Sequence, residues 1–139
     1  MQQKPFEILG HTADLRLYAS GKTKEELFSN MLLGMGTILN PEPIDPEDLP
    51  VRREISVDSM DLSMLLVDFL NEVLYQSTIN KEVYYKVDFV KFQDTFLEAE
   101  LYGKEVDKFE EDIKAVTYHE AKIQQRQDGY LEATVIFYI

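Results

Sequence analysis

The sequence contains no cysteine and no tryptophan, and only two of its 139 residues are histidines. Without cysteine the chain cannot form disulfides, thiolate zinc sites or a cysteine nucleophile. The six glycines are scattered, and no phosphate loop, G-x-S-x-G elbow or H-E-x-x-H motif occurs. No apolar run approaches the roughly 18 residues of a membrane span, and Met1 to Pro5 lacks a signal-peptide core. We therefore expect a cytoplasmic protein that does not enter a membrane.

Basic residues are scarce as well. The chain has 14 Lys and Arg against 26 Asp and Glu, which gives a formal net charge of −12. This field repels phosphate backbones and anionic membrane surfaces, so direct nucleic-acid binding is not expected. The charge favours a cation or a basic protein surface as partner. It would equally serve to keep the protein in solution, and charge alone does not separate these two interpretations.

What the chain does have is enough apolar material for one core. Hydrophobic residues make up 45% of the sequence, and 8 Tyr and 8 Phe supply large side chains. Domains most often contain roughly 100–150 residues. We therefore expect residues 1–139 to form a single domain.

The apolar spacing predicts two helices and seven strands. Thr23 followed by Glu26 is a capping box, and helical spacing continues to about Leu39. Asp61 can cap a second helix that runs to about Ser77. Alternating or apolar runs predict strands at 6–9, 15–19, 53–58, 85–92, 96–102, 113–125 and 130–139, the last two joined by a turn at Asp128-Gly129. This order predicts an α/β (α+β) two-layer sandwich, with two helices packed on a largely antiparallel sheet.

Two segments carry the only histidines and other reactive side chains. His11 and Asp14 share one short connection, and Lys114 precedes His119 in a predicted strand. In that strand Thr117 and His119 would point to the face opposite Lys114. An imidazole beside a carboxylate can perform acid–base chemistry or bind a metal. The same residues can instead cap turns and satisfy backbone groups, and both interpretations remain open.

Four segments, in order and in approximate spacing, resemble the archease family over nearly the whole chain. None of them is specific alone, and the resemblance depends on the four together. They are His11-Thr12-Ala13-Asp14, Gly21 with Thr23-Lys24-Glu25-Glu26-Leu27-Phe28, Asp61 to Glu72, and Ile113-Lys114-Ala115-Val116-Thr117-Tyr118-His119.

The resemblance implies a compact α/β sandwich that is not itself an enzyme. It implies a helper of the GTP-dependent tRNA-splicing RNA ligase, which speeds guanylylation of the ligase, sustains its turnover and broadens its nucleotide use. It also implies, for some members, a chaperone-like role towards a tRNA methyltransferase. The resemblance also implies which residues would act with Asp14 at the contact with the ligase. They are His11, Lys114, Thr117 and His119.

The resemblance further implies a calcium-like divalent metal site. In the family it uses the aspartate that corresponds to Asp14, an aspartate one residue from the C-terminus, and the terminal residue. Here Tyr138 stands where that second aspartate is usual, so only Asp14 and the carboxylate of Ile139 carry over. A neutral phenol is a poor ligand for a hard cation, which prefers carboxylate oxygens, so this change should weaken metal binding.

Two other functional classes compete with the ligase helper. A general chaperone would suppress the aggregation of unrelated proteins. A metal-dependent hydrolase would use His11, Asp14 and His119, and would show phosphatase or nuclease turnover. Fold and family analogy alone do not fix function, so these assays separate the three classes.

Overall fold

The computed structural model describes residues 5–10 and 14–139. This part of the chain forms two helices and eight strands. Two strands are followed by a helix, a strand, a second helix and then five further strands. The elements are β1 (Phe6–Gly10), β2 (Asp14–Gly21), α1 (Lys24–Leu39), β3 (Val51–Asp58), α2 (Leu62–Asn80), β4 (Glu82–Gln93), β5 (Phe96–Glu105), β6 (Ala115–Thr117), β7 (Gln124–Gln125) and β8 (Leu131–Tyr138).

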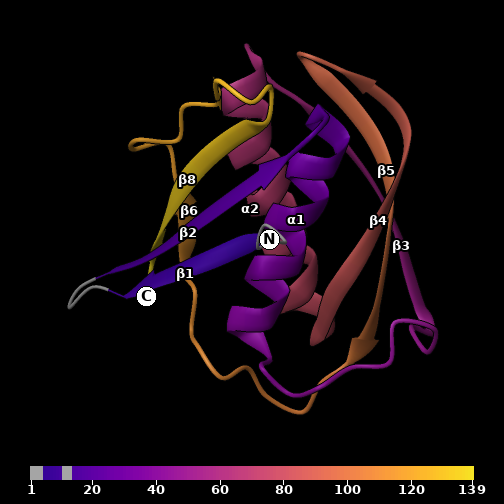
Figure 1. Ribbon diagram of the computed structural model, residues 1–139. Helices are drawn as coiled ribbons and strands as arrows, with labels where there is room; N and C mark the ends of the chain where they lie inside the picture. Colours follow the sequence, from indigo (N-terminus) through magenta and orange to yellow (C-terminus); the bar gives the residue numbers. More distant parts are fainter. Residues whose placement is uncertain (1–4, 11–13) are drawn as a thin grey trace.

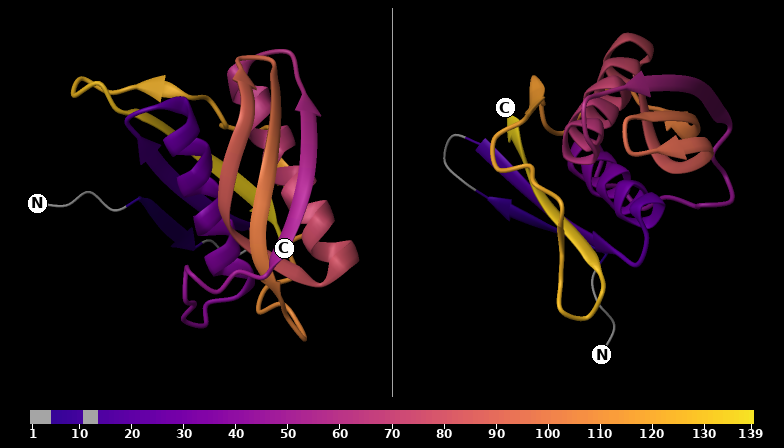
Figure 2. Two further views of the ribbon diagram at one scale, coloured as in Figure 1. Left: turned by 90° about the vertical axis from the view of Figure 1, so that its right-hand side faces the viewer. Right: turned by 90° about the horizontal axis from the view of Figure 1, so that it is seen from above.

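The strands form two antiparallel sheets with the helices packed against both (Figure 1). One sheet has the order β1-β2-β8-β6, with β7 also pairing with β8, and the other has the order β3-β5-β4. Helix α1 contacts β2 in the first sheet and β4 in the second, and α2 contacts β6 and β3 in the same way. The predicted α+β class, two helices on antiparallel strands, is confirmed. The division of the strands between two sheets, visible in both views of Figure 2, was not predicted.

The composition of the helices explains why each can cover two sheets. Helix α1 buries residues on most of its circumference, from Leu27 and Phe28 to Ile38 and Leu39. Helix α2 buries three consecutive residues, Leu65 to Val67, along with five later ones. A helix that is apolar nearly all round must be buried on more than one side. Neither α1 nor α2 has the length and apolar character that a membrane crossing would require.

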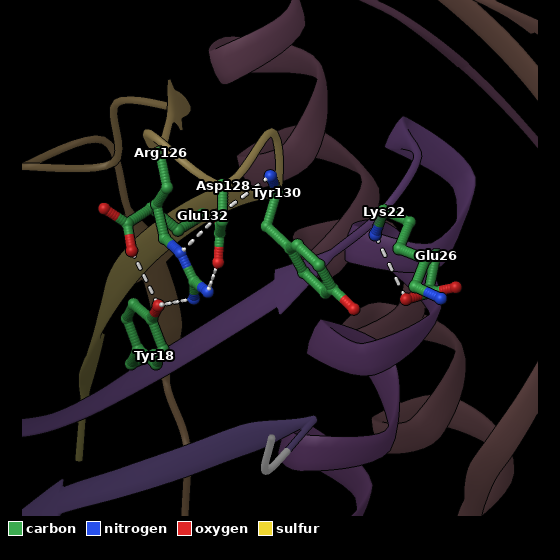
Figure 3. Close-up of polar contacts among 7 residues, drawn as sticks. All are labelled: Tyr18, Lys22, Glu26, Arg126, Asp128, Tyr130 and Glu132. Carbon is green, nitrogen blue, oxygen red and sulfur yellow. Dashed lines mark hydrogen bonds and ion pairs between the residues drawn. The ribbon is translucent and has the colours of Figure 1, made fainter. Parts of the chain in front are cut away.

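Helix α1 begins with the predicted capping box. The N–H of Glu26 donates to Oγ1 of Thr23 over 3.1 Å. The N–H of Lys22, one residue before the cap, donates to Oε1 of Glu26 over 3.1 Å (Figure 3). Further along, Gly36 faces β4 so closely that a Cβ there would lie 2.7 Å from the carbonyl oxygen of Tyr84. A glycine at this position therefore lets α1 approach the second sheet.

Helix α2 begins at the predicted cap and ends later than predicted. Oδ1 of Asp61 accepts a hydrogen bond from the N–H of Met64 over 2.8 Å. The helix continues through Asn80, about one turn past the predicted end near Ser77. It stops at Lys81, which adopts the left-handed conformation with φ of 54° and donates its N–H to the carbonyl of Ser77.

The prediction of one strand from residue 113 to residue 125 is wrong. Only β6 and β7 are strands there. Side chains of α2 bind the backbone of β6, Tyr118 after it, and the N–H of Ile123, which donates to Oγ of Ser63 over 3.0 Å. The amide of Asn71 donates to the carbonyl of Val116 over 2.8 Å and accepts the N–H of Val116 over 2.9 Å. Farther along, the hydroxyl of Tyr118 donates to Asp68 of the same helix. Glu120 then turns the chain with φ of 61°, a conformation that a strand excludes.

The β7–β8 hairpin turns where it was predicted to turn. Gly129 has φ of 89°, and the N–H of Arg126 donates to the carbonyl of Tyr130 over 2.7 Å. Nη1 of Arg126 also donates to the hydroxyl of Tyr18 over 3.1 Å, and this hydroxyl donates to Oε2 of Glu132 over 2.6 Å (Figure 3). Burial, followed by the hydrogen bond to Glu132, raises the pKa of Tyr18. This contact fastens the hairpin to β2.

A buried carboxylate joins β3 to β4 in the second sheet. The side chain of Glu82 is only 4% exposed. It accepts two hydrogen bonds of 2.9 Å from Nε and Nη2 of Arg53, and one of 2.7 Å from the hydroxyl of Tyr84. The hydrogen bonds from Arg53 hold the pKa of Glu82 below its ordinary value despite burial, and Tyr84 lowers it further. Arg53 and Tyr84 therefore stabilise the ionised form of the Glu82 carboxylate.

Candidate functional site

The predicted site lies at one end of the first sheet, where three strands meet. Asp14 of β2 is paired with Tyr138 of β8, and Tyr138 is paired on its other side with Ala115 of β6. Paired residues of antiparallel strands share a face, so these three side chains form one row. Leu17, three positions after Asp14 in β2, faces α1, where a Cβ on Gly34 would lie 2.7 Å from its side chain. Since residues of a strand alternate, Asp14 points to the face away from the helices.

Two charged side chains of β2 carry buried polar atoms that have no hydrogen-bond partner among residues 5–10 and 14–139. They are Oδ1 of Asp14 and Nε of Arg16, which lie on the same face because they are two residues apart. Arg16 is otherwise engaged, because its Nη1 donates to Oε2 of Glu120 over 2.9 Å. Buried polar atoms are nearly always hydrogen-bonded, and leaving one unpaired costs roughly 1–3 kcal/mol. This end of the sheet therefore holds one acceptor and one donor that a partner could satisfy.

The structure brings most of the predicted residues to this end and separates one from the rest. The N–H of Lys114 donates to the carbonyl of Tyr138 over 2.8 Å, which places Lys114 beside Asp14's strand partner. Thr117 is paired with Ile136, which is paired on its other side with Arg16. His119 lies beyond the end of β6, so its predicted place in the same strand as Thr117 is wrong. His11 lies outside the described residues.

His119 is poorly placed for chemistry with Asp14. Its side chain is 74% exposed, and its Nε2 lies 3.8 Å from Oε1 of Glu120. Its backbone N–H donates to Oγ1 of Thr117 over 3.3 Å, which fixes the backbone more than the imidazole. The imidazole therefore lies on the turn after β6, while Asp14 lies in β2.

Arg16 and Glu120 were not predicted from the sequence. Arg16 could have been found, because it follows Asp14 at the two-residue spacing that places strand side chains on one face. Nothing local pointed to Glu120, which is 104 positions away from Arg16 in the chain. Its carboxylate reaches Arg16 only because the turn after β6 folds over the outer face of the sheet.

A surface hollow of about 240 Å³ lies beside this turn, at the start of α2. Its lining includes Ser63 and Val67 of α2, and Tyr118, Glu120 and Lys122 from the connection between β6 and β7. Glu120 thus belongs both to the hollow and to the ion pair with Arg16. The hydrogen bond to Asp68, and to a lesser degree burial, raises the pKa of Tyr118, so its phenol stays protonated at neutral pH.

The residues at this end do not by themselves fit a calcium site. Asp14 offers one buried carboxylate oxygen, and the terminal carboxylate of Ile139 follows Tyr138 directly. Calcium takes 6–8 oxygen ligands and prefers several carboxylates. Tyr138 supplies only a neutral phenol, and within the described ranges 5–10 and 14–139 no three His, Asp or Glu side chains are arranged to hold a metal ion.

Replacing Tyr138 by aspartate should raise calcium affinity by at least about tenfold, because it places a second carboxylate directly opposite Asp14. Isothermal titration with CaCl₂ measures this change. Tyr75→Asp is the matched control, since Tyr75 is 56% exposed and Tyr138 is 58% exposed, but Tyr75 lies on α2. Equal calcium affinity in the two variants would show that the pairing of Asp14 with residue 138 does not form a cation site.

Comparison with known proteins agrees with the fold and with the order of the segments. Residues 6–139 match the model of the Archease protein family (MTH1598/TM1083). The chain is 36% identical to the archease of Methanosarcina barkeri, with 97% of each chain covered, and 32% identical to that of Pyrococcus abyssi, with 96% of this chain and 97% of the relative covered.

Two solved structures share the fold. The solution structure of Methanobacterium thermoautotrophicum protein 1598 superposes with a TM-score of 0.74 at 28% identity, and covers 99% of this chain and 100% of its own. The crystal structure of a Thermotoga maritima archease, described as a possible chaperone, gives a TM-score of 0.65 at 21% identity over 100% of this chain and 98% of its own. At that identity the second likeness concerns the fold only. With the family match spanning nearly all of its length, the chain belongs to the archease family.

Proposed function

We propose that this chain is a non-enzymatic protein cofactor that activates a GTP-dependent tRNA-splicing RNA ligase in the cytoplasm by promoting its guanylylation and multiple turnover. The observation that carries the proposal is a pair of buried atoms, Oδ1 of Asp14 and Nε of Arg16, that have no hydrogen-bond partner in the described part of the chain. In the isolated chain these atoms cost free energy. A protein partner that docks on this end and hydrogen-bonds to both would recover that cost.

The arrangement favours assistance over catalysis. Acid–base or nucleophilic chemistry needs two reactive groups within about 3 Å of each other. In the part of the chain that the structure describes, the side-chain contact at this end is the ion pair of Arg16 with Glu120, and a guanidinium does not release its proton in a protein. Asp14 and Tyr138 are strand partners, and no side-chain hydrogen bond joins them within the described residues. A carboxylate and a phenol on a rigid sheet can hold a partner's cation or histidine in position, which is the task of a cofactor protein.

Charge supports a basic partner surface. The net charge of −12 would steer an acidic protein towards a basic cleft. An enzyme that binds RNA and GTP has such a cleft, because it must neutralise phosphates. The encounter should be transient and should weaken as the salt concentration rises.

The test is multiple-turnover RNA ligation by the ligase of the same organism, with and without this protein. Asp14→Asn removes the charge and nearly keeps the shape, so it should reduce activation at least about tenfold, the effect of losing about 1.4 kcal/mol of contact energy. The matched control is Asp58→Asn, because Asp58 is exposed at the end of β3 in the other sheet. The control should activate like the wild type.

Undiminished activation by Asp14→Asn would contradict the proposed role of Asp14. Failure of the wild type to activate at any concentration would contradict the ligase partnership itself. A chaperone-like modulator of a tRNA methyltransferase is then the next candidate, because Ile8, Leu9 and Tyr138 expose apolar surface at this end. That function predicts that the chain keeps the methyltransferase from aggregating, whether or not Asp14 is present. Phosphatase or nuclease turnover would instead indicate the hydrolase alternative.

A further inference from the structure

The two sheets expose four edges, and three of them carry devices that discourage pairing with another chain. Strand β3 alternates exposed charged residues, including Arg52, Glu54 and Asp58, along its edge. Strand β4 carries Lys86 and Lys91 and has two register irregularities, one between Tyr84 and Lys86 and one between Phe89 and Lys91. Charges, lysines and bulges are the usual means by which edge strands avoid association.

The far edge of the first sheet is protected in another way. Strand β6 is only three residues long. The outward N–H and C=O of Val116 are both taken by the side chain of Asn71. No extended segment could pair with β6 without displacing this amide, and β7, which pairs with β8 farther along, is only two residues long.

Within the residues that the structure describes, strand β1 has none of these protections. It forms the remaining edge of its sheet, beside β2 (Figure 1). Ile8 is 41% exposed and Leu9 is 39% exposed, and Glu7 is the only charged residue of the strand. An edge strand with exposed apolar side chains and one charge is well suited to accept another strand.

The register of β1 shows which of its backbone groups are available. The N–H of Ser20 donates to the carbonyl of Pro5 over 3.3 Å, so residue 5 belongs to a hydrogen-bonded pair with β2. Hydrogen-bonded and non-hydrogen-bonded residues alternate in antiparallel strands. Glu7 and Leu9 therefore point their backbone groups towards β2. Phe6, Ile8 and Gly10 point theirs away from the sheet.

We propose that β1 pairs antiparallel with β1 of a second copy of this chain, about a two-fold axis at Ile8. This register places Ile8 opposite Ile8 of the other copy, and Phe6 opposite Gly10. All the outward backbone groups then lie in hydrogen-bonded pairs. Glu7 comes opposite Leu9, so the only charge of the strand does not meet itself. A strand that is complementary to itself about its centre makes the isologous contact that a two-fold dimer needs.

The dimer should be weak, and salt should strengthen it. One short strand pair buries less than the roughly 1,200 Å² of a standard interface. Each copy carries a net charge of −12, so the copies repel each other until salt screens them. We expect a dissociation constant between about 10 μM and 1 mM, smaller at high salt. The docking of a basic partner at the Asp14 end would show the opposite salt dependence.

Sedimentation equilibrium of the full chain from about 10 μM to 1 mM tests the dimer over the expected range. Ile8→Lys places two lysines opposite each other and should weaken association at least about tenfold. Leu9→Lys places each new lysine opposite Glu7 and should strengthen association about threefold. The two variants change the net charge equally. A difference between their effects on association therefore tests the proposed register of the two β1 strands. Val90→Lys, at a 61% exposed position of β4, is the control and should match the wild type.

A wild type that remains monomeric throughout this range would overturn the proposal. So would equal effects of Ile8→Lys and Leu9→Lys, because the register would then be incorrect. If the chain remained monomeric and Ile8→Lys nevertheless weakened activation of the ligase, the strand that pairs with β1 would belong to the partner protein instead of a second copy. Thermal unfolding of each variant shows whether it is folded.

Discussion

Replacing Arg53 by methionine is expected to lower the free energy of unfolding several times more than the same change at the neighbouring Arg52, because it leaves the buried carboxylate of Glu82 without its cation. The side chain of Glu82 is 4% exposed, and two of its three hydrogen bonds come from Arg53. Methionine keeps most of the aliphatic part of the arginine side chain. The loss of stability therefore comes mainly from the missing ion pair and less from altered packing. Urea unfolding followed by circular dichroism measures the change.

A neighbouring arginine gives the control for this result. Arg52 also pairs with a carboxylate, that of Glu100, but its own side chain is 55% exposed. Arg52→Met should therefore lower the free energy of unfolding only slightly, because an exposed ion pair contributes little. Adding Glu82→Gln to Arg53→Met should recover part of the loss, since the buried charge is removed. If both single arginine variants lose the same stability, burial of Glu82 is not the cause.

The same pair predicts the direction of a pH effect. Arg53 holds the pKa of Glu82 below its ordinary value of 4.5 in the folded protein. A group with a lowered folded pKa stabilises the fold above its unfolded pKa, and this contribution is lost as pH falls through the folded pKa. In Arg53→Met, burial without the cation favours the protonated acid. The difference in stability between wild type and Arg53→Met should therefore be largest near neutral pH and shrink below about pH 4.

Replacing Asn71 by leucine is expected to cost about 2–3 kcal/mol, because both backbone groups of Val116 would lose their partners. Val116 is 3% exposed, so water cannot easily replace the amide. Leucine keeps the helix and nearly the volume of the side chain. Besides urea unfolding, amide hydrogen exchange should show faster exchange at Val116 and at Lys114, whose N–H binds the carbonyl of Tyr138.

The control for Asn71 lies on the same helix. The amide of Gln76 bonds only to Glu72 and Asn80 among the hydrogen bonds resolved, both within α2. Gln76→Leu should cost well under 1 kcal/mol and leave exchange at Val116 unchanged. Equal losses for Asn71→Leu and Gln76→Leu would mean that the amide of Asn71 does not hold β6. If Asn71→Leu lost more stability than Gln76→Leu but hydrogen exchange at Lys114 stayed unchanged, the effect of Asn71 would be limited to Val116.

Local signals predicted the helices and the tight turn. Thr23 and Asp61 cap their helices as expected, and the turn at Gly129 closes the last hairpin, because each depends on residues a few positions apart. The segment from residue 113 to residue 125 could not be predicted from periodicity. Its backbone is bound by side chains of α2, 45 positions away in the case of Asn71 and Val116. The division into two sheets has the same kind of cause, since strand pairing is decided by distant partners.

The candidate site was predicted in part for a related reason. Asp14 and Lys114 were singled out, and the structure places both beside Tyr138. Family resemblance supplied that grouping, because local sequence cannot show that β2 pairs with β8. The buried state of Oδ1 of Asp14 and Nε of Arg16 is a property of the assembled sheet. It could be recognised only with coordinates.

The pairing of β2 with β8 constrains how the chain folds as it is synthesised. Asp14 of β2 is paired with Tyr138 of β8, so β2 cannot complete its pairing until β8 has been synthesised. The second sheet, by contrast, uses strands between residues 51 and 105 and can form earlier. Until β8 emerges from the ribosome, β2 has a strand partner on only one side, β1. Closing so long a loop is slow, so the nascent chain passes through a half-assembled state in which one sheet is complete and the other is missing its central strand.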